Sequence, residues 1–372
     1  MPSSESAWSA VLDAVCAGTG VSAVFQPIVD TARGIIVGFE GLARFDTSEP
    51  VGVEEVFAQA RAANRSAEVE ARCLRVVLAE RASIPTNCFL TVNVSPHVLG
   101  DEWIRAVWRE YPDLQGVIVE ITEQSAIESY LNLEPELNSI RGAGALIAID
   151  DVGSGYAGLT HLLALKPALI KLDRELIKGI DGDEAKRALV EMIGTFASRI
   201  DSWVLAEGIE TAAEYDTITA LGVPLAQGYY LARPGPGWPV LDRPVLPAIV
   251  SQSVPTVRDL LDVVPAVATA SSAAALFTDD PGLRAVVLID HTNRPVSVLD
   301  SESAHLGVTT DGLRVNLDTP VRDALLRAIT RDRGQRYDPL ILTDNAGRYA
   351  GIVRMERLIT DAVRHASAPR SL

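Results

Sequence analysis

A short apolar run that ends in two adjacent carboxylates constrains this chain more than any other stretch. Residues 145–149 are all apolar, Asp150 and Asp151 follow at once, and Gly153 and Gly155 come next. An apolar run of this length, bounded by turn residues, is typical of a fully buried strand. Its last residues then lie at the carboxyl end of the strand, where α/β proteins place their functional groups. Because two neighbouring aspartates repel each other, we expect a cation beside them, and a divalent metal ion is the obvious one.

Strand-like and helix-like segments alternate as far as residue 230 of the 372-residue chain. Two strands joined by a short turn, residues 21–29 and 35–44, predict an antiparallel hairpin. Helical patterns separate the further strands, which we predict at 88–93, 117–123, 145–150, 168–173, 203–208 and 224–230. This alternation predicts a mostly parallel sheet, and its length suits a closed (β/α)8 TIM-like barrel. An open doubly wound sheet is the alternative, but no GxGxxG motif follows the first strand, so we favour the barrel.

A proline-rich segment, residues 233–247, predicts a domain boundary. We therefore expect a barrel over residues 1–244 and a smaller α+β domain over residues 250–372. The second domain carries a weak internal repeat, because Val257-Arg-Asp-Leu-Leu is echoed by Val321-Arg-Asp-Ala-Leu-Leu. Each half has the pattern helix, strand, turn, strand, helix, which predicts two copies packed on each other.

Composition and charge exclude several classes of protein. The net charge of −16 argues against a general nucleic-acid-binding or anionic-membrane surface. Three cysteines without CxxC spacing argue against a disulfide framework or a zinc site. The N-terminus lacks the pattern of a signal peptide, and no apolar run approaches the length of a membrane span. We expect a cytoplasmic protein.

Polar residues stand at the carboxyl ends of nearly all the predicted strands: Glu40, Asn93, Glu120, Asp150, Asp151, Lys171, Glu207 and Gln227. One strand-end acid has a structural explanation, but so many at one rim need a compensating cation, because desolvating like charges together is costly. Carboxylate and amide oxygens suit hard ions such as Mg²⁺ or Mn²⁺. Asp150 and Asp151 together would suit two bridged ions, the arrangement used for in-line displacement at phosphorus.

These residues carry a family resemblance. From about residue 20 to residue 234, the chain resembles the EAL family of cyclic di-GMP phosphodiesterases. The matching pieces are Gln26-Pro27, Glu40-Gly41-Leu42 with Arg44, Asn93-Val-Ser95-Pro96, Glu120-Ile-Thr-Glu123, Asp150-Asp151-Val-Gly-Ser-Gly-Tyr156, Lys171-Leu-Asp173, Ala206-Glu207-Gly-Ile-Glu210-Thr and Gln227-Gly228-Tyr229. The chain departs from the family pattern at Gly41, where the family has alanine, and at Val152, where it usually has phenylalanine.

The resemblance implies a hydrolase, a cyclic-guanylate-specific phosphodiesterase. Such an enzyme opens cyclic di-GMP to linear pGpG by in-line attack of a metal-activated water. Two ions, Mg²⁺ or Mn²⁺, are implied, one held by Glu40, Asn93, Glu120 and Asp150 and the other by Asp150, Asp151 and Glu207. The implied catalytic residues are Glu207 as general base, Lys171 to orient the water, and Asp151. The implied substrate contacts are Gln26, Arg44 and Gln227, and Glu123 would brace the loop 153–158.

Some of these roles have alternatives. Arg44 is also compatible with a surface ion pair, and Lys171 with a purely neutralising role. Glu123 and Glu210 are each also compatible with an acid at a helix N-terminus, where the helix dipole stabilises it, and for Glu210 we favour that role. The rival function is a receptor that binds cyclic di-GMP without turnover and signals through a protein partner. Glu207, Asp151 and Lys171 favour the enzyme, whereas Gly41 and Val152 keep the receptor open.

The C-terminal domain is similar to a pair of CBS units, which in other proteins bind adenine nucleotides or mediate dimers. Two alternatives remain open for it: a sensor of adenine nucleotides, and a dimerisation platform without a ligand. We expect a homodimer.

Overall fold

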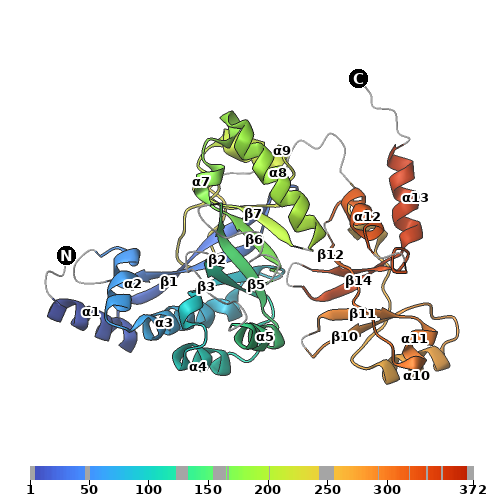
Figure 1. Ribbon diagram of the computed structural model, residues 1–372, viewed down its shortest axis with the longest axis horizontal. Coiled ribbons are helices and arrows are strands. Elements are labelled where there is room, and N and C mark those ends of the chain that lie inside the picture. Colours follow the sequence, from blue (N-terminus) through green and yellow to red (C-terminus); the bar gives the residue numbers. More distant parts are fainter. Residues whose placement is uncertain are drawn as a thin grey trace. The chain divides into compact units, whose positions relative to one another are not determined.

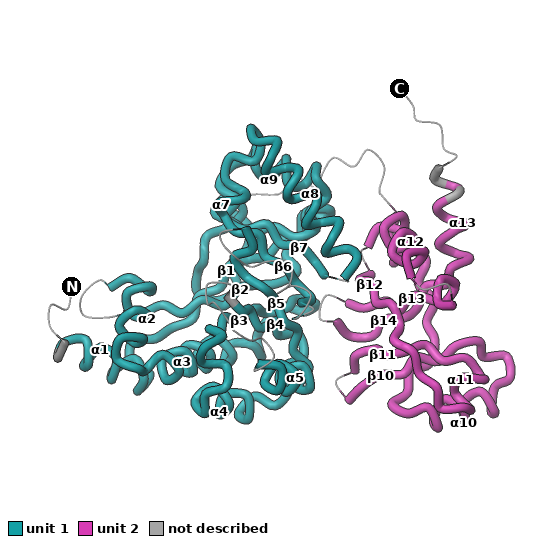
Figure 2. The backbone as a smooth tube through the Cα atoms, viewed as in Figure 1, with its two compact units in different colours: residues 1–249 teal, residues 250–372 magenta. Residues whose placement is uncertain are grey.

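The structure is a computed structural model. It describes residues 5–46, 51–122, 133–153, 165, 167–200, 202–242, 255–291, 293–317, 319–331, 334–344 and 347–366. The chain divides into two compact units, residues 1–249 and 250–372 (Figure 2). Within the described ranges, none of the helices combines the length and the apolar character that crossing a membrane requires.

The first unit is a closed barrel of eight strands that follow one another in chain order (Figure 1). β1 (Val21–Asp30) and β2 (Ile35–Phe45) form an antiparallel hairpin, and β8 (Leu225–Ala226) closes the barrel antiparallel to β1. The remaining neighbours are parallel: β3 (Phe89–Val94), β4 (Val117–Thr122), β5 (Leu146–Val152), β6 (Leu169–Leu172) and β7 (Trp203–Ala206). The predicted TIM-like barrel with an antiparallel first hairpin is confirmed.

Helices occupy most of the connections, as Figure 1 shows. They are α1 (Glu5–Ala17), α2 (Val53–Ala62), α3 (Ser66–Ala79), α4 (Glu102–Glu110), α5 (Glu134–Gly142), α7 (Arg174–Ile177), α8 (Glu184–Arg199) and α9 (Ala212–Ala220). Helices α2 and α3 are separated where Asn64 takes a left-handed φ of 55°. Helix α4 begins at Glu102, because the Asp101 side chain accepts a hydrogen bond from the Trp103 N–H as the N-cap.

The barrel interior is apolar towards the amino ends of its parallel strands, which we call the floor, and polar towards their carboxyl ends, above that floor. One buried apolar side chain from each strand fills the lower layer: Ile28, Val37, Phe89, Ile118, Ala148, Leu169, Leu205 and Leu225. In a strand, side chains two positions apart point to the same side. Two positions after the apolar residues of β4 to β8 come Glu120, Asp150, Lys171, Glu207 and Gln227. The strands therefore deliver these side chains to one end of the barrel, above a packed floor.

The two adjacent aspartates lie in a β-bulge. Ile149 pairs with Ile170 and Val152 with Leu172, so Asp150 and Asp151 together oppose the single residue Lys171. Asp151 takes a left-handed φ of 61°, a conformation that aspartate tolerates better than most residues. The extra residue lets Val152 return to the outer core, where it is buried. A second acid is thus accommodated without disturbing the packing outside the barrel.

Gly41 makes room for helix α3. A Cβ atom at this position would lie 2.2 Å from Cγ1 of Val77 and 3.3 Å from the carbonyl oxygen of Thr91. We expect Gly41→Ala to lower the free energy of unfolding by about 1–3 kcal/mol through overpacking. In Gly41→Ala/Val77→Ala the clash is removed, so the double variant is expected to be more stable than the sum of the single effects. Urea unfolding of the four proteins measures this coupling, and strictly additive effects would contradict it.

The second unit contains two three-stranded sheets that show the predicted repeat. One has the order β11–β10–β9 and the other β12–β13–β14. The strands are β9 (Ala266–Val267), β10 (Val286–Ile289), β11 (Pro295–Leu299), β12 (Arg314–Asn316), β13 (Leu340–Thr343) and β14 (Tyr349–Val353). The helices are α10 (Ala270–Asp279), α11 (Ser301–Leu306), α12 (Val321–Ile329) and α13 (Met355–Ala366). The turn of each hairpin closes in the same way, since Asp290 accepts a hydrogen bond from the Arg294 N–H and Asp344 from that of Arg348.

The two halves of the second unit share a core but differ at their starts. Val287 of one sheet packs with Ile341 and Ile352 of the other. Residues Val257–Leu260, which begin the repeated sequence of the first half, form a 3-10 turn, whereas their counterparts from Val321 onward begin helix α12. Val257 packs into the core of the second half, so the start of one half completes the other.

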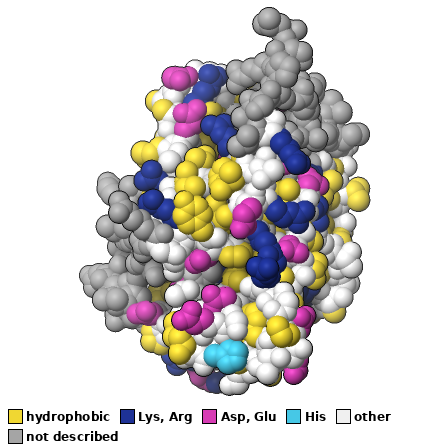
Figure 3. Space-filling model, turned by 90° about the vertical axis from the view of Figure 1, so that its right-hand side faces the viewer, with side chains coloured by type: hydrophobic (Ala, Val, Ile, Leu, Met, Phe, Trp, Pro, Cys, Tyr) yellow, Lys and Arg dark blue, Asp and Glu magenta, His cyan; other side chains and the backbone are white. Residues whose placement is uncertain are grey.

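Several large apolar side chains of the second unit are exposed, namely Val263, Leu306, Val308, Leu326, Ile329, Tyr337 and Ile359. Figure 3 shows a face of the molecule on which apolar side chains gather among Lys and Arg side chains. Exposed apolar side chains occur at interaction sites and also singly on the surfaces of monomers. The homodimer stays a prediction.

Candidate active site

A buried lysine lies at the centre of the carboxylates above the barrel floor. The side chain of Lys171 is 1% exposed, and that of Glu120 is fully buried. The Lys171 Nζ atom lies 2.6 Å from Oε1 of Glu207 and 2.7 Å from Oε2 of Glu120. It lies 3.2 Å from Oδ1 of Asp150 and 3.6 Å from Oε1 of Glu40. The predicted strand-end residues of β2, β4, β5, β6 and β7 therefore meet around one ammonium group.

Amide side chains hold Glu40 on the opposite side. Asn93 Nδ2 donates to Oε1 of Glu40 at 3.1 Å, and Gln227 Nε2 donates to Oε2 at 2.6 Å. Gln227 Nε2 also lies 2.9 Å from Oε1 of Gln26, whose Nε2 donates to the Ala232 carbonyl. The three amides thus form a chain of hydrogen bonds that fixes the orientation of the Glu40 carboxylate.

The charges in this cluster do not balance. Four carboxylates surround Lys171, which gives a net charge of about −3 if all of them are ionised. Burial raises the pKa of Glu120 to about 8, with Lys171 opposing the shift and Glu40 and Asp150 adding to it. Burial likewise raises the pKa of Glu207 well above its usual value, against the attraction of Lys171. The cluster holds protons unless a further cation is present.

The pKa values of Glu40, Lys171 and Asp151 are shifted by different balances of burial and charge. For Glu40, burial favours the neutral acid, but Lys171 and the amide hydrogen bonds outweigh burial and lower its pKa. For Lys171, burial is outweighed by the surrounding carboxylates, which raise its pKa well above the usual value. Burial, followed by repulsion from Asp150, raises the pKa of Asp151 to about 6.

The donor chemistry fits divalent metal ions. Every candidate ligand is a carboxylate or an amide, the set that Mg²⁺ and Mn²⁺ prefer. Oε1 of Glu120 is buried and receives no hydrogen bond from any residue that the structure describes. Across the described ranges, however, no three His, Cys, Asp or Glu side chains form a ready-made metal site. The Lys171 ammonium takes the central position, so ions would bind with a rearrangement of this group.

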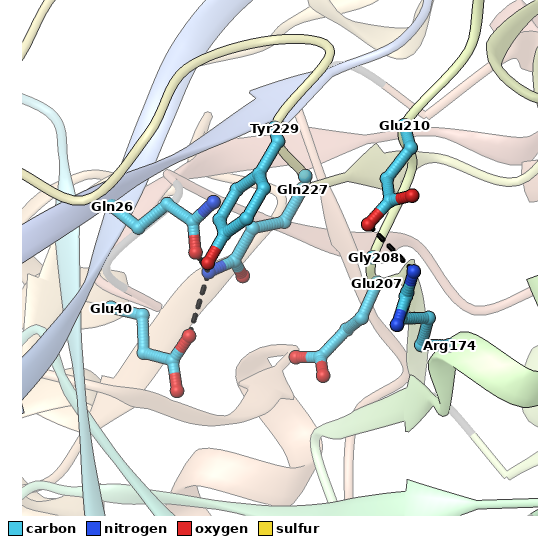
Figure 4. Close-up of a pocket in the computed structure, with 9 residues that line it drawn as sticks. Gln26, Glu40, Arg174, Glu207, Gly208, Glu210, Gln227 and Tyr229 are labelled. Atoms are coloured by element: carbon cyan, nitrogen blue, oxygen red, sulfur yellow. Dashed lines mark hydrogen bonds and ion pairs between the residues drawn. The ribbon is translucent and has the colours of Figure 1, made fainter. Parts of the chain in front are cut away.

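A pocket of about 220 Å³ opens beside the cluster. Figure 4 shows Gln26 and Glu40 on one side of it, Glu207 in the middle and Arg174 with Glu210 beyond. Gly208, Gln227, Gly228 and Tyr229 complete the lining. Sequence reasoning had assigned no role to Arg174 or Tyr229. Tyr229 belongs to the motif Gln227-Gly228-Tyr229, and Arg174 directly follows the motif Lys171-Leu-Asp173.

Other predicted residues lie elsewhere. Arg44 is half-buried, and its Nη1 donates to the Ala43 carbonyl at 2.8 Å; it is not among the residues that line the pocket. Glu210 directly precedes Thr211, the N-cap of α9, and pairs with Arg174, whereas Glu214 is the acid within the first turn of that helix. Glu123 lies outside the described residues, as does the loop 154–158.

A supporting carboxylate was also missed by sequence reasoning. Glu70 of α3 is buried, and its Oε2 accepts a hydrogen bond from the Ser95 N–H at 2.8 Å. This bond fixes the turn that follows Asn93. A polar position within an apolar helix face was the signal that would have found it.

The raised pKa values predict a pH dependence of stability. A carboxyl whose pKa is raised by folding binds its proton more tightly in the folded state, so stability is lost as pH rises from its unfolded to its folded pKa. For Glu120 this interval runs from 4.5 to about 8. We expect the free energy of unfolding of the metal-free protein to fall by up to about 1.4 kcal/mol per pH unit across it. Urea unfolding in EDTA at pH 5.5 and 8 measures this, and Glu120→Gln should flatten the dependence. A stability that rises over this interval would contradict it.

Comparison with known proteins gives a consistent family signal. The model of the EAL domain family matches residues 9–234. The cyclic di-GMP phosphodiesterase PA2567 of Pseudomonas aeruginosa is 29% identical over 227 residues, covering 58% of this chain and 38% of its own length. The blue light- and temperature-regulated antirepressor BluF of Escherichia coli is 24% identical over 227 residues, covering 58% of this chain and 56% of BluF. The chain therefore covers 38% and 56% of the lengths of these two relatives.

Solved structures show the same relationship. BlrP1 of Klebsiella pneumoniae, in a complex with calcium and cyclic di-GMP, has 29% identity and a TM-score of 0.54, covering 60% of this chain and 58% of that chain. Its complex with manganese and cyclic di-GMP has 30% identity and a TM-score of 0.51, covering 58% and 56%. A standalone EAL protein of Vibrio cholerae, in its c-di-GMP-bound form, has 26% identity and a TM-score of 0.51, covering 60% and 95%.

Proposed function

This chain belongs to the EAL domain family, and we propose that it hydrolyses cyclic di-GMP to linear pGpG with Mg²⁺ or Mn²⁺. One observation carries the proposal: the carboxylates Glu40, Glu120, Asp150 and Glu207 converge on Lys171 beside a pocket. A charge-dense cluster beside a pocket suits electrostatic stabilisation of phosphoryl transfer. Homology to cyclic di-GMP phosphodiesterases supports the choice of substrate.

Two ions would bind in the cluster. The proposed ligands of one are Glu40, Asn93, Glu120 and Asp150, and those of the other are Asp150, Asp151 and Glu207. Such ions lower the pKa of a coordinated water and draw negative charge from the phosphoryl oxygens. Their binding would also release the protons that burial holds on Glu120 and Glu207.

Glu207 is the proposed general base. It lines the pocket and is half-buried, so a water molecule in the pocket can reach its carboxylate. Burial raises its pKa, and ion binding would release the proton that burial holds there, so that the carboxylate could accept a proton from the attacking water. As the proton of the attacking water moves to Glu207, the water oxygen bonds to one phosphorus and the opposite P–O3′ bond breaks. The released 3′ oxygen then takes a proton from solvent.

The other side chains position the reactants. Lys171 orients the attacking water and neutralises part of the carboxylate charge. Gln26 and Gln227 line the pocket and offer hydrogen bonds to the ligand. Arg44 is proposed for a substrate phosphate because its guanidinium matches two phosphate oxygens. Asp151 completes the second ion's ligands.

A receptor is the second candidate. BluF, which by name is an antirepressor, matches 58% of this chain. In such a protein the same pocket would bind cyclic di-GMP without turnover, and a protein partner would receive the signal. The departures at Gly41 and Val152 are compatible with both functions.

One experiment separates the two candidates. The full-length protein is incubated with cyclic di-GMP and Mg²⁺, Mn²⁺ or EDTA, and the products are separated by chromatography. We expect linear pGpG with either metal and none with EDTA. Tight binding measured by calorimetry, without any product, would overturn the enzyme and support the receptor.

We propose that residues 250–372 form a regulatory domain and that residues 1–244 form the catalytic barrel. The repeated sheets support comparison with a pair of CBS units, and the exposed apolar side chains support a homodimer. Calorimetry with adenine nucleotides distinguishes a sensor from a ligand-free platform.

A further inference from the structure

An ion pair beside the carboxylate cluster has no part in the hydrolysis proposed above. Arg174 Nη2 lies 2.7 Å from Oε1 of Glu210, and the two side chains are 47% and 45% exposed. Both line the same pocket as Glu207 and Gln227. Figure 4 shows the pair on the far side of Glu207 from Glu40, at the edge of the view into the pocket. A ligand whose phosphate reaches Glu207 would therefore bring a neighbouring group to this pair.

The pair is held in place by local structure. Gly208 has a φ of 65°, and a Cβ atom there would lie 2.5 Å from Cγ of Arg174. The stem of Arg174 therefore lies directly over Gly208, the residue that follows the proposed base. The buried Glu214 carboxylate accepts hydrogen bonds from the Gly179 and Glu210 N–H groups, each at 2.9 Å. One carboxylate thus ties the segment after α7 to the loop that carries Glu210.

The chemistry of the pair favours an uncharged ligand group. Glu210 already neutralises Arg174 and would repel a phosphate brought to that guanidinium. Together they present adjacent hydrogen-bond donors and an acceptor with little net charge. Guanine offers the complementary set, because O6 and N7 accept from a guanidinium while N1–H and N2–H₂ donate to a carboxylate. Adenine carries an acceptor at N1, which the Glu210 carboxylate would repel.

We infer that the Arg174–Glu210 pair reads a guanine base of the cyclic dinucleotide and makes the pocket selective against adenine. This inference rests on the proposed function, since it places the adjoining phosphate at the carboxylate cluster. Tyr229, 48% exposed, lines the same pocket and supplies an aromatic surface within it.

The test compares substrates with and without a guanine base. Full-length wild type, Glu210→Gln and Arg174→Met are assayed with Mn²⁺ on cyclic di-GMP, cyclic di-AMP and bis(p-nitrophenyl) phosphate, which has no base. For both variants we expect kcat/KM for cyclic di-GMP, relative to that for bis(p-nitrophenyl) phosphate, to fall about tenfold or more. This fall should come mainly from a higher KM for cyclic di-GMP. The preference for cyclic di-GMP over cyclic di-AMP should shrink by a similar factor.

A matched control removes the same charge elsewhere. Glu102 pairs with Arg109 on the exposed surface of α4, outside the pocket. Glu102→Gln should leave the substrate ratio as in the wild type.

The outcomes separate the two proposals. Equal losses on all three substrates, or an unchanged ratio, would overturn the base site while leaving the phosphodiesterase standing. Binding of cyclic di-GMP by the wild type without cleavage would overturn the proposed phosphodiesterase activity. The base site is then tested by calorimetry, as the ratio of the Kd for cyclic di-AMP to the Kd for cyclic di-GMP in wild type and variants. Wild type that neither binds nor cleaves cyclic di-GMP would overturn both.

Discussion

Glu207→Gln is expected to lower kcat for cyclic di-GMP by about 10²- to 10⁴-fold while the protein stays folded. An amide cannot accept the proton of the attacking water, yet it has nearly the same shape as the carboxylate. Lys171 keeps Glu120, Asp150 and Glu40 as partners, so the variant does not leave a buried charge unpaired. The loss should therefore appear in turnover and not in stability.

Stability is the readout that distinguishes this role from a structural one. Because burial raises the pKa of Glu207, replacing it with a neutral amide should leave the metal-free protein at least as stable at pH 8 as the wild type. Glu191→Gln, at an exposed position of α8, serves as a control with normal turnover and stability. If Glu207→Gln kept more than about a tenth of the wild-type kcat, another group would have to be the base.

The placement of the polar cluster follows from the sequence because period-two alternation and parallel pairing leave little freedom. Leu169 and Lys171 are two residues apart, as are Leu205 and Glu207, so an apolar floor places both polar residues above it. The order of the strands then brings neighbours in the sequence together at one rim. Fold and cluster were predictable for this reason.

The remaining features depend on three-dimensional contacts that no local pattern encodes. The bulge that sets Asp150 and Asp151 against Lys171 is visible only in the register with β6. Arg174 reaches the pocket because Gly208, thirty-four residues later, leaves room for its stem. Glu210 stands at the amino end of α9, but its pairing with Arg174 depends on a residue thirty-six positions earlier in the chain. In each case a distant residue decides between two locally acceptable conformations.

Lys171→Met is expected to have the largest effect on stability. The ammonium is 1% exposed and has four carboxylates within 3.6 Å, so its removal leaves buried like charges without compensation. Removing one partner of a buried ion pair costs about 3–5 kcal/mol. We expect a loss of this size in the free energy of unfolding of the metal-free protein at pH 8, measured by urea unfolding in EDTA. At pH 5.5 protonation of Glu120 should make the loss smaller.

The same variant decides between the two roles open to Lys171. Adding Mn²⁺ should restore much of the stability, because ions then supply the positive charge that the carboxylates need. If Lys171 orients the attacking water, turnover stays low in the stabilised, metal-loaded variant. If it only neutralises the acids, turnover returns together with stability. Equal stability of Lys171→Met and wild type in EDTA at pH 8 would contradict the charge imbalance that we assign to this cluster.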